Sequence, residues 1–272
     1  MTRWIPLDPA THQEACWFKH RDYSFAARDH LAPVVMAEIT QVLPWYPLAF
    51  ASNEQGSRFH LVALLSLMPG RNLYLTPQGK WQAPYVPSHY RGYPFALNGE
   101  GQLCIDVESE LFTESDTPGA LPIFEHGELA EITAQVKQFH EKRHQALALT
   151  QKLVDQLHEA ELITPWAIQW KPKAKVQTLK GYCGIDEERL RSLAPEQYAE
   201  LAHSGALGLA YVQIFSRARI ADLQYRHRKQ PGHGQPKGDD KAERHLHAVE
   251  KTDSLDGLFG EGDDDLEFDF DR

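Results

Sequence analysis

Two histidines and a glutamate stand at the spacing of a zinc site in the segment His140-Glu141-Lys142-Arg143-His144. On a helix, side chains four residues apart share a face, so two imidazoles can bind one Zn²⁺ while the glutamate activates water. The pattern is short, however, in a chain with 14 histidines, and Lys142 and Arg143 would place two cations beside the metal. The competing interpretation is a solvated helix edge, and the sequence predicts no metal and no cofactor.

Other catalytic patterns are weaker. The serines have no GxSxG setting, and the chain contains no P-loop and no GxGxxG, which removes the common hydrolase and nucleotide-binding signatures. Cys104 and Asp106 lie two residues apart in a predicted strand and form the best candidate for a buried polar pair. The alternative for Cys104 is a small core thiol.

A second kind of chemistry is recognition by aromatic and basic side chains, which dominate the energetics of protein interfaces. Eight such residues recur over one short stretch and form the predicted binding surface: Arg71, Tyr74, Trp81, Tyr85, His89, Tyr90, Arg91 and Tyr93. The alternative is ordinary packing of strands and turns. Further aromatics recur among charges near the N-terminus, where they either line a ligand groove or pack an N-terminal arm onto the sheet: Trp17, Phe18, Tyr23 and Phe25.

Composition limits the possible classes of protein. The chain has 272 residues, of which 42% are hydrophobic, enough for a sizeable core. Its three cysteines have no paired spacing, and no apolar stretch approaches the roughly 18 residues that cross a bilayer. The N-terminus lacks the apolar region of a signal peptide, so a cytoplasmic location is expected. The net charge of −10 makes nucleic acid a poor partner.

The elements expected to position these residues combine strands and helices. Short apolar runs bounded by Gly, Pro and Asn predict an antiparallel meander of strands over 46–97, with turns at 68–72 and 76–80. An apolar stripe at helical spacing predicts a long helix over 128–161. A helix over 34–43, two short helices after 186 and an apolar helix over 205–225 complete an α+β fold.

The C-terminal region differs in composition from the rest. The predicted domain covers 1–225, and a flexible basic linker is expected over 226–252. The tail 253–272 carries nine acids and one arginine, a net charge of −8. Six bulky apolar residues alternate with these acids and could order on a basic, apolar groove of a partner or of the chain's own domain: Leu255, Leu258, Phe259, Leu266, Phe268 and Phe270. The alternative is a solubilising tail.

The order of several motifs resembles one family. These motifs are YPLAF after a helix, LVALLSLMPGRNLYLTPQGKWQAPYVPSHYRGYPFAL, GQLCIDVESELF, a long helix ending in LITPW, GYCGIDEERLRSL and SGALGLAYVQIFS. Over residues 30 to 220 the chain is similar to the SapC-like family of bacterial proteins. The resemblance implies an association with a surface layer, and with TonB-dependent receptors and flavin-dependent tryptophan halogenase-like proteins. It implies no catalytic residue and no metal motif at 140–144.

Two functions follow as expectations. The first is a non-enzymatic binding or accessory protein that recognises a peptide or protein through the aromatic surface and the tail. The second is an enzyme that modifies a peptide or an amino-acid derivative with an active site the sequence conceals.

Overall fold

The computed structural model describes residues 2–52, 58–170 and 177–229. The predicted α+β class is confirmed, because antiparallel strands and helices make up both halves of the described chain. Within the predicted domain, the contacts group into two compact units. The described part of unit 1 is 2–23 and 90–145, and the remaining described residues form unit 2. Most of the predicted linker and all of the predicted tail lie outside the described residues.

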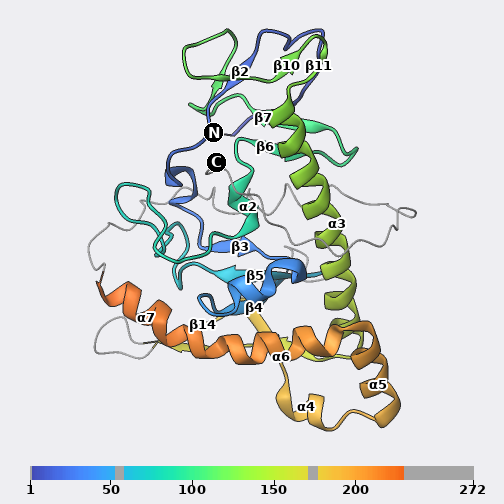
Figure 1. The fold of residues 1–272 in the computed structure, drawn as a ribbon. Coiled ribbons are helices and arrows are strands. Elements are labelled where there is room, and N and C mark those ends of the chain that lie inside the picture. The colour runs from blue at the N-terminus through green and yellow to red at the C-terminus, as the bar shows by residue number, and fades with distance from the viewer. Residues whose placement is uncertain (1, 53–57, 171–176, 230–272) are drawn as a thin grey trace. The chain divides into compact units, whose positions relative to one another are not determined.

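Unit 2 is built on a five-stranded antiparallel sheet in the order β12-β15-β4-β5-β3. Its strands are β3 (Leu31–Pro33), β4 (Leu48–Ser52), β5 (Phe59–Leu64), β12 (Ile163–Pro165) and β15 (Tyr182–Ile185). A separate ribbon pairs β13 (Ile168–Trp170) with β14 (Gln177–Leu179). β4 and β5 are central strands of this sheet. Their sequences are nearly continuous apolar runs, which is typical of strands buried on both faces. Figure 1 shows β3, β4 and β5 side by side.

Unit 2 also contains short helices. They are η1 (Ser24–Ala26), η2 (Met36–Glu38), α1 (Ile39–Val42), α4 (Glu187–Arg191), α5 (Pro195–Ser204), α6 (Ala206–Ser216), η3 (Arg217–Arg219) and α7 (Ile220–Lys229). The helix predicted over 205–225 is therefore divided, since η3 separates α6 from α7. Two of the three boundaries between the units in the described chain fall inside helices, one in α2 (Ser88–Arg91) and one in α3 (Glu131–Glu159). The third boundary lies between Tyr23 and Ser24.

Buried polar side chains fasten α6 to the sheet. Gln213 is fully buried, and its amide donates to the carbonyl of Leu48 (3.1 Å) and accepts from the backbone N–H of Ile185 (2.9 Å). The neighbouring Ser216 hydroxyl accepts from the N–H of Leu48 (2.9 Å). These bonds give α6 one register on β4 and β15, since a buried amide left unpaired costs about 1–3 kcal/mol.

A buried carboxylate organises the start of unit 2. Glu38 is 2% exposed and lies at the end of η2. Its Oε1 accepts from the N–H of Val35 (3.1 Å) and the hydroxyl of Ser88 (2.8 Å). Its Oε2 accepts from the N–H of Ser88 (2.7 Å) and the hydroxyl of Tyr85 (2.8 Å). One side chain thereby joins η2 to the chain around residue 88.

The predicted meander is shorter than expected. Between 72 and 86 the described pairing is a single bridge, Leu75 with Trp81, around the predicted turn at Gly79 (φ 74°). The N–H of Tyr74 donates to the side chain of Asn72 (2.9 Å), so a side chain takes a backbone donor that a neighbouring strand would otherwise receive. Hydrogen bonds within the turn therefore take the place of the strand pairing that was predicted for 72–86.

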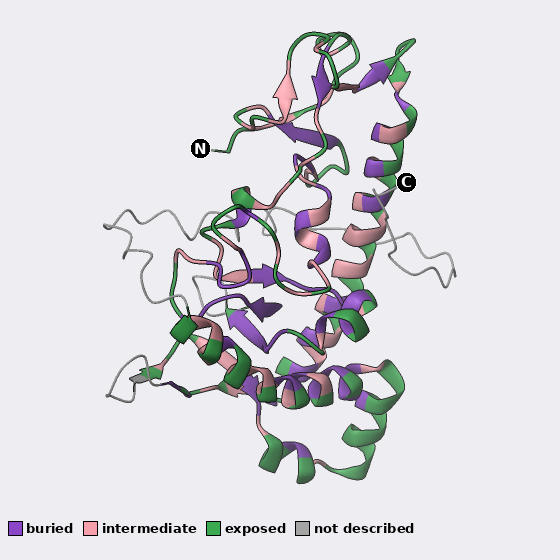
Figure 2. Cartoon of the chain, turned by 60° about the vertical axis from the view of Figure 1, so that its left-hand side comes forward, coloured by how far each residue is buried: buried purple, intermediate pink, exposed green. Residues whose placement is uncertain are grey.

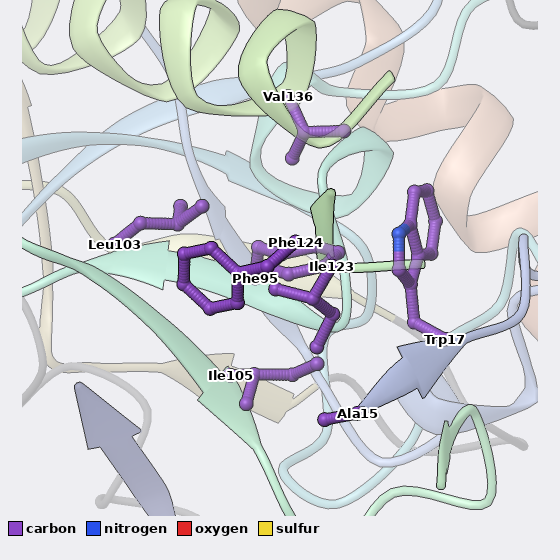
Figure 3. Packing of buried hydrophobic residues seen from close by; sticks show 8 residues of the cluster. All are labelled: Ala15, Trp17, Phe95, Leu103, Ile105, Ile123, Phe124 and Val136. Atoms are coloured by element: carbon purple, nitrogen blue, oxygen red, sulfur yellow. The ribbon is translucent and has the colours of Figure 1, made fainter. Parts of the chain in front are cut away.

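Unit 1 consists of three small antiparallel sheets and the first half of α3. The sheets have the orders β1-β7-β6, β8-β2-β9 and β10-β11. Their strands are β1 (Trp4–Pro6), β2 (Cys16–Trp17), β6 (Phe95–Leu97), β7 (Leu103–Asp106), β8 (Phe112–Thr113), β9 (Leu121–Pro122), β10 (Phe124–Glu125) and β11 (Glu128–Leu129). Figure 3 shows the apolar cluster that unites them: Ala15, Trp17, Phe95, Leu103, Ile105, Ile123, Phe124 and Val136.

The predicted long helix is confirmed as α3, which has 29 residues. Over the stretches 2–52, 58–170 and 177–229, none of the helices combines the length and apolar character needed to cross a bilayer.

Candidate functional site

A cavity of about 360 Å³ lies in unit 1, next to the end of β2. Its walls come from β2 and the residues after it, from 92–93, from the chain entering β9, and from α3. The lining residues are Trp17, Phe18, Lys19, His20, Arg21, Gly92, Tyr93, Gly119, Leu121 and Val136. Two of the four aromatics that the sequence offered as groove residues, Trp17 and Phe18, are in this lining.

The wall formed by Trp17 is rigid. Its ring is 2% exposed, and its indole N–H donates to the hydroxyl of Thr133 (3.1 Å). The ring of Phe95 packs edge-on against it, with centroids 4.9 Å apart and an interplanar angle of 89°. β2 is also the middle strand of its sheet, with Trp17 opposite Phe112 and Leu121. A fixed aromatic wall is suited to binding, because little side-chain entropy remains to be lost.

The chain directly after β2 adds positive charge. Lys19 and Arg21 are exposed, and none of the described residues that line the cavity is an acid. Between them, the Nε2 of His20 lies 3.4 Å from the carbonyl of Arg91. Burial lowers the pKa of His20, while the Arg91 carbonyl and Asp22 oppose that shift. Lys19 and Arg21 are thus the lysine and the arginine of the lining, and both attract anions.

Tyr93 lines the cavity but directs its hydroxyl to a structural carboxylate. The hydroxyl donates to Oδ2 of Asp106 (2.9 Å), and Oδ1 of Asp106 accepts from the N–H of Arg3 (2.9 Å). Burial raises the pKa of Tyr93 to about 12, and Asp106 contributes in the same direction. Tyr93 therefore stays protonated near neutral pH and acts as a hydrogen-bonded wall.

The candidate pair of Cys104 and Asp106 has separate partners. Asp106 is 1% exposed and holds Arg3 and Tyr93 as described above. The thiol of Cys104 lies 3.7 Å from the carbonyl of Gln102, and burial raises its pKa. A raised pKa reduces the thiolate fraction that a nucleophile requires, so Cys104 has the features of a structural thiol.

His140 of the zinc-like motif contacts the wall of the cavity. His140 Nε2 lies 3.2 Å from the carbonyl of Gly92, a lining residue, and since a carbonyl can only accept, this nitrogen carries the proton. Burial lowers the pKa of His140 to about 4. Across residues 2–52, 58–170 and 177–229, no three His, Cys, Asp or Glu side chains gather closely enough to hold a metal ion.

The contact between His140 and the backbone at position 92 leaves room only for a glycine there. A Cβ built at this position would lie 2.2 Å from Nε2 of His140 and 2.6 Å from its Cε1. Because real Cβ atoms do not approach other atoms this closely, any larger residue must displace the buried imidazole. The backbone of Gly92 and the ring of His140 therefore act as one piece of the cavity wall.

A second cavity of unit 1 has a different character. It measures about 550 Å³ and is lined by the polar loop 10–14 together with residues of 3–5 and 107–114. The lining of this cavity includes one arginine, Arg3, and two acids, Glu14 and Glu114. Charges of both signs give it no clear preference for a ligand class, so the cavity at β2 is the stronger candidate.

The eight residues of the predicted binding surface are divided between the units. Arg71, Tyr74, Trp81, Tyr85 and His89 belong to unit 2, while Tyr90, Arg91 and Tyr93 belong to unit 1. Of the eight, Tyr93 alone is among the residues lining the cavity at β2. Their joint role in binding stays a prediction.

Several of these eight side chains have internal partners. Tyr74 and Tyr90 are buried. The indole of Trp81 donates to the hydroxyl of Tyr46 (2.7 Å), and the hydroxyl of Tyr85 donates to Glu38. Packing therefore accounts for Tyr74 and Tyr90, whereas Trp81 and Tyr85 are half-buried and are each held by one of these hydrogen bonds. The basic lining residues 19–21 were not among the sequence candidates, although their position after an aromatic pair was a signal that could have identified them.

Of three comparisons with known proteins, one gives a match. No curated protein and no solved structure matches the chain. The family model SapC matches residues 7–223, which is most of the chain. The chain therefore belongs to the SapC family.

Proposed function

We propose that this chain is a non-enzymatic binding protein that recognises a peptide or protein partner through the cavity at β2. The observation that carries the proposal is that one cavity is lined both by a fixed aromatic wall, Trp17, and by a cationic rim, Lys19 and Arg21. Rigid aromatic and basic groups of this kind provide most of the binding energy at protein interfaces. The charge adds specificity and speeds association.

The volume of the cavity at β2 and the charge of its rim define the class of ligand that it can bind. A volume of about 360 Å³ is at the lower end of the 300–1,000 Å³ typical of ligand sites, so it accommodates one anchor residue and not a folded segment. The cationic rim favours a carboxylate beside that anchor. The proposed ligand is therefore an aromatic or aliphatic residue that adjoins an acidic residue or a free C-terminal carboxylate.

The family resemblance indicates where to look for the partner. Surface-layer components and TonB-dependent receptors are the first proteins to test, and the sequences of their exposed acidic segments can be compared with the peptides the chain selects. This part of the proposal rests on the resemblance and not on the geometry of the cavity.

Selection from a random peptide display library tests the ligand class. The full chain is expected to enrich peptides in which an acidic group adjoins a large apolar residue. Arg21→Glu should weaken binding of a selected peptide at least about tenfold, or about 1.4 kcal/mol, because it reverses a charge at the rim. Fluorescence polarisation with labelled peptide measures the ratio.

A matched control uses a basic residue away from the cavity. Arg28 is exposed, belongs to unit 2 and is not a lining residue, so Arg28→Glu changes the net charge equally and should leave the affinity within about twofold. Enriched peptides without a common acidic group, or equal affinities for the Arg21 and Arg28 variants, would overturn the proposal.

A further inference from the structure

Helix α6 has two different faces. Ala206, Leu209 and Ala210 are fully buried, and the helix is fastened to β4 through Gln213. The other face presents Tyr211 and Phe215, which are 37% and 64% exposed. Phe215 is the most exposed large apolar side chain of the described residues, although it lies in the most apolar short helix of unit 2.

The exposed rings form one surface with α5. The rings of Tyr211 and Phe215 stack with centroids 6.0 Å apart, and the hydroxyl of Tyr198 lies 3.3 Å from that of Tyr211. We name these three residues the aromatic face. Gly208, one turn before Tyr211, is exposed, and a Cβ there would meet no atom within 4 Å. Figure 2 colours parts of α5 and α6 as exposed, and Tyr198, Tyr211 and Phe215 are among the exposed large apolar residues. Contiguous exposed apolar groups mark interaction sites more often than isolated ones do.

Basic residues follow the aromatic face along the chain. Figure 1 shows α6 and α7 following one another, joined by η3. η3 and α7 contain five basic residues against one acid, Asp222, a net charge of +4 over 217–229. Arg217 and Arg219 take part in ion pairs with Glu187 and Asp222, whereas α7 ends in the exposed Arg228 and Lys229. An occupant that matches both features must be apolar and acidic.

We propose that the chain's own segment 253–272 docks in cis on the aromatic face, with its acids toward η3 and α7. The segment fits by composition, because its six bulky apolar residues alternate with nine acids and its net charge is −8. This occupant is independent of the cavity at β2 and of the ligand proposed for it.

The chain length permits this docking. Twenty-three residues, 230–252, connect Lys229 to Asp253. A flexible chain of that length spans roughly 24–29 Å between its ends. The ten residues of α7 and the three of η3 together cover about 21 Å along the helix axes. The segment can therefore return to α6. Tethering also raises its effective concentration to the millimolar range, which favours the chain's own segment over a separate molecule.

Photo-crosslinking in the full chain tests the proposal. With p-benzoylphenylalanine in place of Phe268, the crosslinked products should form within one chain and map by mass spectrometry to α5 and α6. Phe215→Ser should reduce their yield at least about fivefold. Leu149→Ser is the matched control, because Leu149 is 50% exposed in α3, and it should leave the yield unchanged.

The dependence of the crosslinking yield on charge provides a second test. Arg228→Glu combined with Lys229→Glu should reduce the yield, and 0.5 M salt should reduce it in the unaltered chain. Crosslinks between two chains, detected by mixing tagged and untagged protein, would instead identify a second copy as the occupant. That result would overturn the proposal, as would crosslinks scattered over the surface or unaffected by Phe215→Ser.

Discussion

Replacement of Glu38 by alanine is expected to lower the free energy of unfolding of unit 2 by about 4 kcal/mol. The carboxylate accepts four hydrogen bonds, two of them from the backbone N–H groups of Val35 and Ser88. Backbone donors cannot turn away, and each buried donor left unsatisfied costs about 1–3 kcal/mol. Urea denaturation followed by circular dichroism measures the change.

Two further variants serve as comparisons. Glu38→Gln removes the charge but keeps part of the hydrogen bonding, and Glu200→Ala removes a glutamate from the surface of a helix. In Glu38→Gln, one oxygen is replaced by an amide that donates, so one pair of donors loses its acceptor and the expected loss is about 2 kcal/mol. Glu200→Ala removes an exposed glutamate of α5 and should change the stability by less than about 0.5 kcal/mol. Equal losses for Glu38→Ala and Glu200→Ala would contradict the assigned role of Glu38.

The stability of unit 1 is expected to fall by about 3 kcal/mol between pH 6.5 and pH 4 because of His140 alone. Burial lowers the pKa of this imidazole from 6.5 to about 4 in the folded state. In that pH range the unfolded chain binds a proton that the folded chain does not, so stability is complete above pH 6.5 and is lost as the pH falls. Each unit of pKa difference corresponds to about 1.36 kcal/mol.

The contribution of His140 must be measured as a difference. Burial also lowers the pKa of His20, His30 and His227, which act in the same direction. His140→Gln keeps a donor for the Gly92 carbonyl but does not titrate, so its stability should lose about 3 kcal/mol less than the unaltered chain over this range. An NMR titration that gives His140 a pKa near 6.5 would contradict the prediction.

The sequence predicted those elements whose signal is local. The apolar runs of β4 and β5 and the apolar stripe of α3 repeat with the period of their own secondary structure, so neighbouring residues suffice to recognise them. The division of α6 from α7 by η3 was missed, because no Gly or Pro interrupts the chain there.

The contacts that shape the site are not local, and this explains why the sequence indicated them only in part. His140 and Gly92 are 48 residues apart, and Glu38 and Ser88 are 50 apart. Neither pairing produces a periodic pattern. Trp17 and Phe18 were identified as candidates by their aromatic type, but the place of Lys19 and Arg21 at a cavity depends on the pairing of β2 with β8 and β9, about 100 residues away.

Residue type also does not decide burial. Tyr74 and Trp81 have the composition of a binding surface, yet the hydroxyl of Tyr74 donates to the carbonyl of Trp45 (2.8 Å) and the indole of Trp81 donates to Tyr46. Tyrosine and tryptophan serve equally well as core residues when their polar atoms find partners inside. A ring-rich sequence therefore predicts either role until the partners of the polar atoms are known.

The structure of the full chain in complex with its best selected peptide shows directly whether the cavity at β2 is the binding site. We expect the anchor residue to lie in the cavity against Trp17 and Leu121, with a carboxylate oxygen within 4 Å of Lys19 Nζ or an Arg21 guanidinium nitrogen. A peptide bound elsewhere on either unit, with the cavity at β2 unfilled, would contradict it.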